Sequence, residues 1–332
     1  RSSKKRVQFE TSFTLRSPGL EFNDIGYMRY SDVIHHGSWV AYYVRNPFSI
    51  FNNFYLNTNY WMYWNFSGER LSAYTNMNFS TQFKNKWYLN GNFTRSGDNK
   101  STNLLRGGPT FVLPGALNMN LNVQSNRSRK ASFYFGNYQG FGDVKSFRNQ
   151  EYWAGLNYRP INSLAVSFSP AYSITNDALQ YVSENAMKND PRYIFARINQ
   201  KTASFTFRIN YTFTPELSLE YYGQPFVSAG KYSDFKRVSS PKAERFHDRY
   251  RNFLPHEIAF NSTDNLYEID EDQDGTNDYS FDNPDFNFRQ FRSNLVVRWE
   301  YSPGSTLFLV WSQGRTNTES NGSFDYGRDM KD

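Results

Sequence analysis

The sequence has no cysteine, which excludes a disulfide-stapled fold and a zinc site built on cysteine. It also has no apolar run near the roughly 18 residues of a membrane-spanning helix, so an α-helical membrane protein is excluded. The 37 basic residues are scattered along the sequence, whereas nucleic-acid binding requires clustered Lys and Arg. We therefore expect no nucleic-acid partner.

Aromatic residues are abundant, at 19% of the chain, and they alternate with polar residues. In the stretch 292–313, apolar positions recur at every second residue on both sides of Pro303-Gly304, namely Leu295, Val297, Trp299, Tyr301, Leu307, Leu309 and Trp311. Successive side chains of a strand point to opposite faces, so this period predicts two strands. Pro303 and Gly304 suit a tight reversal, which makes the unit a long-armed β-hairpin.

The same unit repeats along the chain, and we predict about thirteen strands. From the fourth strand (71–84) onwards, short connections alternate with long ones near 95–115, 139–147, 174–192 and 224–289. Bacterial outer-membrane barrels have short periplasmic turns and long outer loops, and arms of 9–14 residues fit tilted membrane strands. Only alternate residues face lipid in a barrel, so the mean hydropathy of −0.75 is compatible with one.

The fold class we predict is therefore all-β, an antiparallel transmembrane β-barrel in the outer membrane. A soluble antiparallel sandwich or propeller is the alternative, because its alternation would look the same around a dry core. We expect residues 1–332 to form a single barrel domain with a long extracellular loop at about 224–289. Arg1 is not an initiator residue, so we expect the N-terminal part to lie outside this chain. The last predicted strand needs a returning partner to avoid an open edge, so we also expect a final strand beyond this chain.

One local motif suggests a metal site. Residues 270–278 read DEDQDGTND, the D-x-D-x-D-G start of a calcium loop. Alternate carboxylates converge on a hard cation, and Gly275 permits the sharp bend. The usual twelfth-position Glu is replaced by Phe281, and no flanking helices are evident. The predicted ligands of a structural calcium ion are Asp270, Asp272, Asp274, Thr276 and Asp278, and the alternative is a solvated acidic loop.

Several longer segments carry a family likeness. The segments 17–32 (SPGLEFNDIGYMRYSD), 105–109 (LRGGP), 193–232 and 282–315 resemble the DUF5916 family of large outer-membrane proteins from Bacteroidetes-type bacteria. The resemblance covers essentially the whole chain. It implies an outer-membrane barrel that follows an N-terminal domain similar to family 9 carbohydrate-binding modules. It implies no assigned chemistry.

For function we expect a pore or transport-related protein of the bacterial outer membrane, with lipid as its surroundings and a glycan as one candidate solute. A second reading is a surface binding or assembly module, whose long loops hold a glycan or a partner protein. A third is a membrane-associated glycan hydrolase or carbohydrate-binding protein, acting through the N-terminal domain. The sequence contains no G-x-S-x-G, H-E-x-x-H or P-loop motif, so we assign no catalytic residue.

Overall fold

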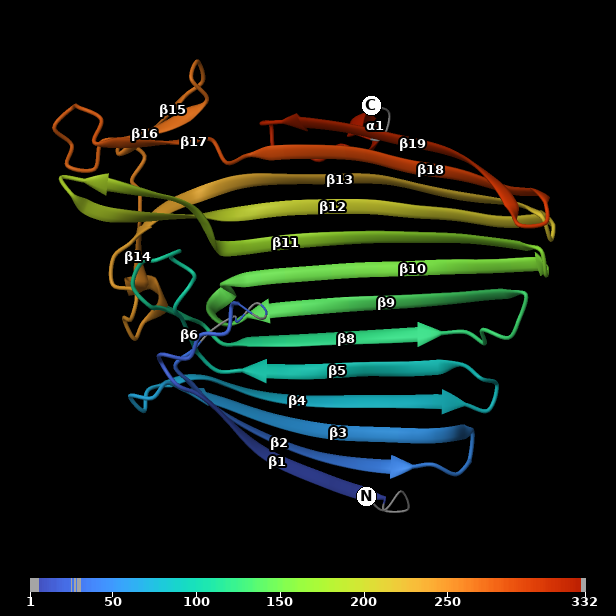
Figure 1. Cartoon of the computed structure of the whole chain (residues 1–332). Coiled ribbons are helices and arrows are strands. Elements are labelled where there is room, and N and C mark those ends of the chain that lie inside the picture. Colours follow the sequence, from blue (N-terminus) through green and yellow to red (C-terminus); the bar gives the residue numbers. More distant parts are fainter. Residues whose placement is uncertain (1–5, 25, 27, 29–30, 330–332) are drawn as a thin grey trace.

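The computed structural model describes residues 6–24, 26, 28 and 31–329, and it is all-β with a large antiparallel sheet (Figure 1). Thirteen strands of this sheet lie side by side in chain order, which confirms the predicted all-β antiparallel architecture and the strand number of about thirteen. They are β1 (Val7–Arg16), β2 (Val33–Val44), β3 (Phe51–Trp64), β4 (Arg70–Phe83), β5 (Tyr88–Ser96), β8 (Ala116–Gln124), β9 (Ala131–Gly142), β10 (Phe147–Ile161), β11 (Leu164–Met187), β12 (Asp190–Thr214), β13 (Leu217–Val238), β18 (Phe286–Ser302) and β19 (Ser305–Glu319).

The register between strands sorts the side chains onto two faces. Met77 pairs with Phe93, and Phe93 pairs with Met119, so these three share what we call the apolar face. One position away, Asn78 pairs with Asn92, and Asn92 pairs with Asn120, on the opposite, polar face. Paired residues lie on the same side of a sheet. The alternation seen in the sequence is therefore a property of the whole sheet.

Asparagine side chains link neighbouring strands on the polar face. The Asn59 Nδ2 group donates to Asn76 Oδ1 at 2.8 Å, and Asn76 Nδ2 donates to Thr94 Oγ1, also at 2.8 Å. Asn78 Nδ2 donates to Asn57 Oδ1 at 2.7 Å. Cross-strand polar pairs of this kind satisfy side-chain donors that would otherwise compete for the backbone.

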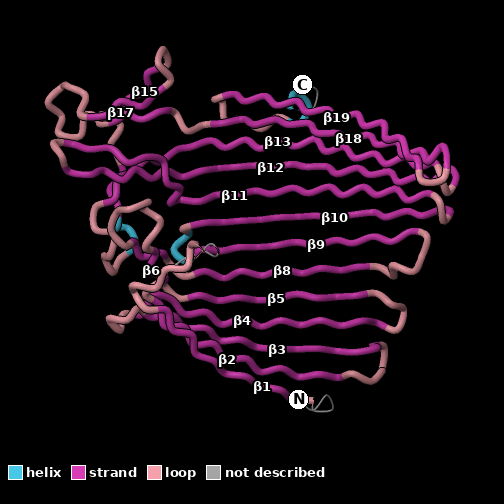
Figure 2. The backbone as a smooth tube through the Cα atoms, in the orientation of Figure 1, coloured by secondary structure: helices cyan, strands magenta, loops and turns pink. Residues whose placement is uncertain are grey.

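Most turns at one end of the sheet are tight, whereas the opposite end carries larger structures (Figure 2). There, β6 (Asn99–Ser101) pairs with β7 (Phe111–Leu113), β14 (Tyr250–Asn252) pairs with β13, and β15 (Ile258–Asn261), β16 (Leu266–Ile269) and β17 (Tyr279–Asp282) form a three-stranded sheet. The described residues also form three short helical turns: η1 (Asp143–Lys145), η2 (Phe246–Arg249) and α1 (Tyr326–Asp329). Among the residues described, no helix is long and apolar enough to cross a membrane.

Three predicted loops are shorter than we expected. The region 174–192 is a continuous hairpin of β11 and β12. The pairing shifts register at β-bulges near Asp177 and Tyr181 and then continues as far as Met187 and Asp190. The connection at 139–147 is mainly the single turn η1. The loop at 224–289 begins only after Val238, because β13 stays paired with β18 from Leu217 to Gly230 and then pairs with β14.

The buried hydrophobic side chains gather at the end with the larger structures. One cluster centres on Ile194, Ile269 and Phe281, and a second centres on Phe111 and Phe195. In both clusters the extended hairpin of β11 and β12 packs against segments from the connections. These two clusters thus lie at one end of the thirteen-stranded sheet.

Along most of the sheet the apolar face remains uncovered. Large apolar side chains on it that are more than a third exposed include Phe9, Phe13, Val40, Met77, Phe93, Leu121, Phe133, Phe135, Leu156, Phe168, Phe213, Trp299, Leu309 and Trp311. Residues 321–329 fold back over part of this face. There, the Phe324 ring meets Tyr172 at 6.2 Å between centroids, and the buried Asp329 accepts a hydrogen bond from Asn287 Nδ2 at 3.1 Å.

Within the described residues the two outermost strands each have one partner. β1 pairs with β2, and β19 pairs with β18. The sheet is therefore open between β1 and β19 over the described part of the chain, and no closed barrel is present there.

Candidate functional site

The acidic segment predicted to bind metal is the connection between β16 and β17. These strands pair from Ile269 and Tyr279 outwards, so residues 270–278 form a closed loop at the end of a small hairpin. Gln273 and Gly275 have φ values of 60° and 89°. Glycine adopts this left-handed backbone without strain, which fits the sharp bend predicted at Gly275.

Three of the predicted ligands converge. Asp270, Asp272 and Asp278 each offer one carboxylate oxygen, and these oxygens lie within 4.8 Å of one another. The loop backbone helps to hold them, because Asp278 Oδ2 accepts the N–H of Glu271 at 2.7 Å and Asp270 Oδ2 accepts the N–H of Gly275 at 3.0 Å. Carboxylate oxygens gathered in this way can hold a hard cation.

Asp274, which was also predicted as a ligand, is not part of this cluster, and a role for the backbone carbonyl of Thr276 stays a prediction. Asp274 Oδ1 accepts hydrogen bonds from the hydroxyl and the backbone N–H of Thr276, at 2.5 and 2.9 Å. These bonds hold the pKa of Asp274 below its usual value. Lys188, from the turn between β11 and β12, instead approaches the cluster, with its Nζ 2.7 Å from Asp272 Oδ2.

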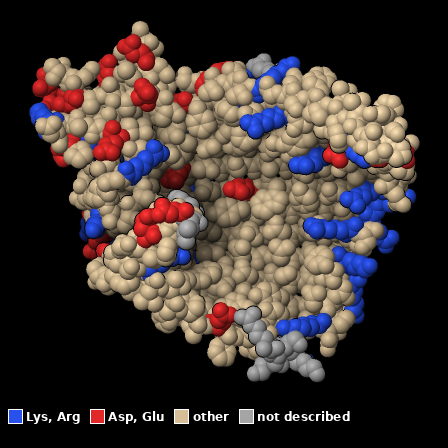
Figure 3. Space-filling view, viewed as in Figure 1, with Lys and Arg blue, Asp and Glu red and all other residues tan. Residues whose placement is uncertain are grey.

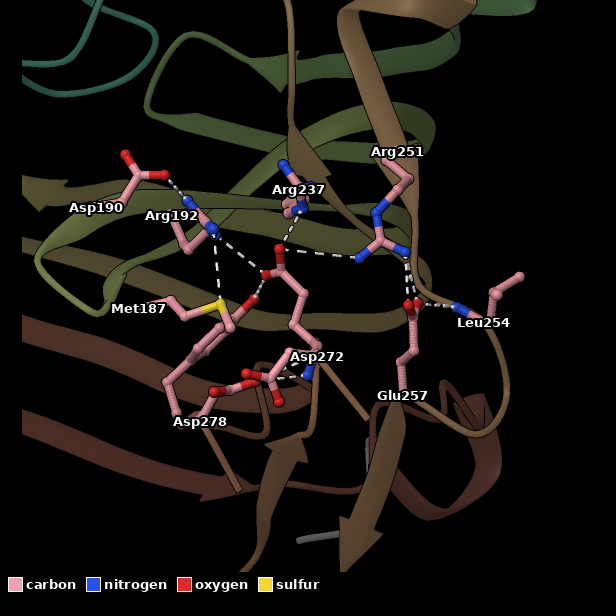
Figure 4. Close-up of polar contacts among 11 residues, drawn as sticks. Met187, Asp190, Arg192, Arg237, Arg251, Leu254, Glu257, Asp272 and Asp278 are labelled. Carbon is pink, nitrogen blue, oxygen red and sulfur yellow. Dashed lines mark hydrogen bonds and ion pairs between the residues drawn. The ribbon is translucent and has the colours of Figure 1, made fainter. Parts of the chain in front are cut away.

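Glu271, between Asp270 and Asp272, anchors the loop through its contacts with Arg192 and Arg237, both labelled in Figure 4. Its side chain is only 7% exposed, and Arg237 Nε lies 2.8 Å from Oε1. Arg192 Nε and the Tyr279 hydroxyl donate to Oε2 at 3.1 and 2.7 Å. Burial, followed by the bond to Glu271, raises the pKa of Tyr279. Glu271 therefore joins the loop to the extended ends of β12 and β13.

A second buried carboxylate, that of Glu257, is linked to Glu271 through Arg251, which contacts both. Both oxygens of Glu257 accept from Arg251 Nη1 at 2.7 Å, and Oε2 also accepts the Leu254 N–H at 2.7 Å. Burial opposes ionisation of Glu257, but the Leu254 N–H and the Arg251 guanidinium together hold its pKa below the usual value. Sequence reasoning missed both glutamates, because the sequence does not show which carboxylates the fold buries.

Cross-strand pairing also locates the tryptophans. Trp299 and Trp311 lie on the apolar face, where they are 48% and 67% exposed. Trp153 lies on the polar face, where its ring covers Gly136 of the neighbouring strand; a Cβ at Gly136 would be 2.3 Å from that ring. Aromatic side chains laid over a cross-strand glycine fix the register of a sheet.

Comparison with known proteins places the chain in a family. No curated protein matches the chain. The profile described as "Domain of unknown function (DUF5916)" matches residues 1–332, which is the whole chain. The resemblance noted from the sequence is thus confirmed, and the chain belongs to the DUF5916 family.

Proposed function

We propose that the sheet is part of the wall of a β-barrel in the bacterial outer membrane, with the apolar face toward lipid and the polar face toward a lumen. The uncovered apolar face supports this proposal. On the three adjacent strands β9, β10 and β11, the side chains of Phe133, Leu156 and Phe168 are 47%, 48% and 41% exposed. Soluble monomers seldom expose contiguous apolar patches larger than roughly 300–600 Å². Lipid would solvate such a face without cost.

Strand lengths are consistent with this arrangement. The shortest strands of the main path, β5 and β8, have nine residues, and β12 has 25. A tilted membrane strand needs about 9–11 residues. A closed barrel also requires partners for the free edges of β1 and β19, because an unpaired edge cannot lie in hydrocarbon. A further segment of the protein or another chain would supply them.

The asparagine-rich polar face suits a hydrated lumen, so we infer a pore or transport-related role for a polar solute, glycans included. Planar-bilayer recordings on the full-length protein test this role. Stepwise conductance is expected from an open lumen. A full-length protein that inserts but gives neither conductance nor solute flux would exclude the pore.

A second candidate function is surface binding of a glycan or a partner protein through residues 239–285. This segment has folded structure of its own, and Figure 1 shows β15–β17 projecting beyond the main sheet. Replacing residues 258–282 by a short Gly-Ser linker should abolish capture of the partner while leaving membrane insertion intact. Retained capture would rule out the β15–β17 sheet as the binding element.

We also propose that Asp270, Asp272 and Asp278 bind calcium, which would rigidify the loop by neutralising packed carboxylates. In calorimetric titrations with CaCl₂, the Asp272→Asn/Asp278→Asn variant should lose binding, whereas the control Asp264→Asn/Asp282→Asn should retain it. Lys188→Gln should bind calcium more tightly, because the lysine ammonium occupies a position beside Asp272. Equal calcium affinities in the parent, the two double variants and Lys188→Gln would show that calcium does not bind at these three aspartates.

A further inference from the structure

Basic side chains gather at the end of the sheet that carries the short turns. Figure 3 shows Lys and Arg along this end, and the acidic side chains mostly at the opposite end. Three neighbouring turns contribute: 84–87, between β4 and β5; 125–130, between β8 and β9; and the end of β10. We call five residues here the basic mouth, namely Lys86, Arg127, Arg129, Lys130 and Arg159.

The basic mouth lines two adjoining cavities. The first, of about 420 Å³, is lined by all its arginines and Lys130, together with Gln124, Ser132, Tyr134 and Asn157. The second, of about 350 Å³, is lined by Lys86 and Arg127 with Gln82, Tyr88, Asn90, Gln124, Asn126 and Ser128. Gln124 and Arg127 belong to both. Gln82, Tyr88, Gln124 and Tyr134 form one cross-strand row on the polar face, so the cavities open on the side of the proposed lumen.

Backbone hydrogen bonds hold the basic residues close together. The Arg159 N–H donates to the Lys130 carbonyl at 2.6 Å, which ties the second turn to the end of β10. Within that turn, Asn126 Oδ1 accepts the Ser128 N–H at 2.9 Å. In the first turn the Lys86 N–H donates to the Phe83 carbonyl at 2.8 Å. The charged side chains thus project from short, fixed turns.

No ion pair neutralises these five side chains within the part of the chain that the structure describes. The local sequence explains this for the four that precede Arg159, because Asp98 is the only acidic residue between positions 71 and 142. Asp98 lies at the other end of the strands, where its Oδ2 is 3.3 Å from Arg249 Nη2. Like charges held together without counter-charges repel one another, and a bound anion relieves that repulsion.

We propose that the basic mouth binds a water-soluble anion that carries two or more phosphate or carboxylate groups. Arginine guanidinium groups bind such oxygens through paired hydrogen bonds. The amide and phenol groups of Gln124, Asn157 and Tyr134 line the same cavity and suit the hydroxyls of a sugar acid or sugar phosphate. The role at a lumen entrance rests on the proposed barrel, whereas anion binding does not. The position on the polar face favours a dissolved anion over a lipid headgroup.

Titration calorimetry of the detergent-solubilised full-length protein with pyrophosphate tests this proposal. Removing two cationic contacts with Arg127→Gln/Arg159→Gln should weaken binding about 30-fold, given roughly 1 kcal/mol for each contact in water. All five side chains are exposed, so these changes leave the fold intact. The control Lys201→Gln/Lys231→Gln removes the same charge from two exposed lysines within β12 and β13, away from the short turns, and should bind like the parent. Binding should also weaken in 0.5 M NaCl.

Two results would overturn the proposal: no pyrophosphate binding by the parent protein, or equal weakening in the mouth and control variants. A flotation assay with phosphatidylglycerol vesicles tests the alternative that the basic mouth binds an anionic lipid headgroup instead of a dissolved anion. If Arg127→Gln/Arg159→Gln loses vesicle binding but keeps its affinity for pyrophosphate, the basic mouth binds a lipid headgroup and the proposal fails. Pyrophosphate binding by a protein that does not insert into membranes would refute the barrel while leaving the anion site standing.

Discussion

Replacing Leu156 by arginine should show whether the apolar face of the sheet contacts lipid or water. Leu156 lies on the apolar face of β10, pairs with Phe133 and Phe168, and is 48% exposed. The adjacent Asn157 lies on the polar face and is also exposed. Asn157→Arg is therefore a matched control, one residue away on the same strand.

The expected magnitude follows from the depth of Leu156. It lies five positions before Ile161, the last residue of β10. At about 3.3 Å per residue and a tilt near 40°, that distance is roughly 13 Å along the barrel axis, close to the middle of an apolar band of about 25 Å. An arginine on the lipid face at that depth costs about 2–4 kcal/mol. In water, an exposed substitution usually stays within about 0.5 kcal/mol.

This difference in folding free energy can be measured by urea titration of the protein folded into lipid vesicles. The heat-dependent shift in gel migration reports the folded fraction at each urea concentration. Leu156→Arg should lower the folding equilibrium constant about 30-fold or more relative to Asn157→Arg. If the two variants differ by less than about 0.5 kcal/mol, the apolar face does not contact lipid and the reasoning fails.

Three further predictions concern the rest of the fold. Glu271→Gln leaves partly buried arginines without their carboxylate and should destabilise the β15–β17 region by about 3 kcal/mol, which limited proteolysis of residues 239–285 would detect; the exposed control Asp282→Asn should resist cleavage like the parent. Burial lowers the pKa of Lys236 to about 8 from an unfolded value of 10.5, so the unfolded chain binds more protons between these values and stability should rise by about 3 kcal/mol as pH goes from 8 to 10.5; a rise of the same size in Lys236→Met would show that other groups cause it. Gly136→Val forces a side chain into the Trp153 ring and should cost about 1–3 kcal/mol in a urea titration; unchanged stability would show that the ring moves aside freely.

The strands and their faces could be predicted because alternation is local. The pairing of Leu295 with Trp311 and of Val297 with Leu309 follows from the period-two pattern around Pro303-Gly304. The hairpin at 174–192 was missed because bulges near Asp177 and Tyr181 break that period, and a broken period in polar sequence resembles a loop.

The candidate site was predicted less completely, because ligand geometry depends on the folded loop. Spacing alone indicated five ligands, but only the carboxylates of Asp270, Asp272 and Asp278 converge, whereas the Asp274 carboxylate accepts hydrogen bonds from Thr276. Glu271 could not be singled out from sequence, since its partners Arg192 and Arg237 lie far away in the chain. Likewise, the basic mouth forms only when the sheet brings three turns together.

The proposed outer-membrane location is tested most directly by gel migration of the full-length protein extracted from isolated outer membranes. We expect a compact band in unheated samples that shifts on boiling, as a detergent-resistant barrel would give. A protein found in the soluble fraction, with no shift on boiling, would contradict the membrane assignment.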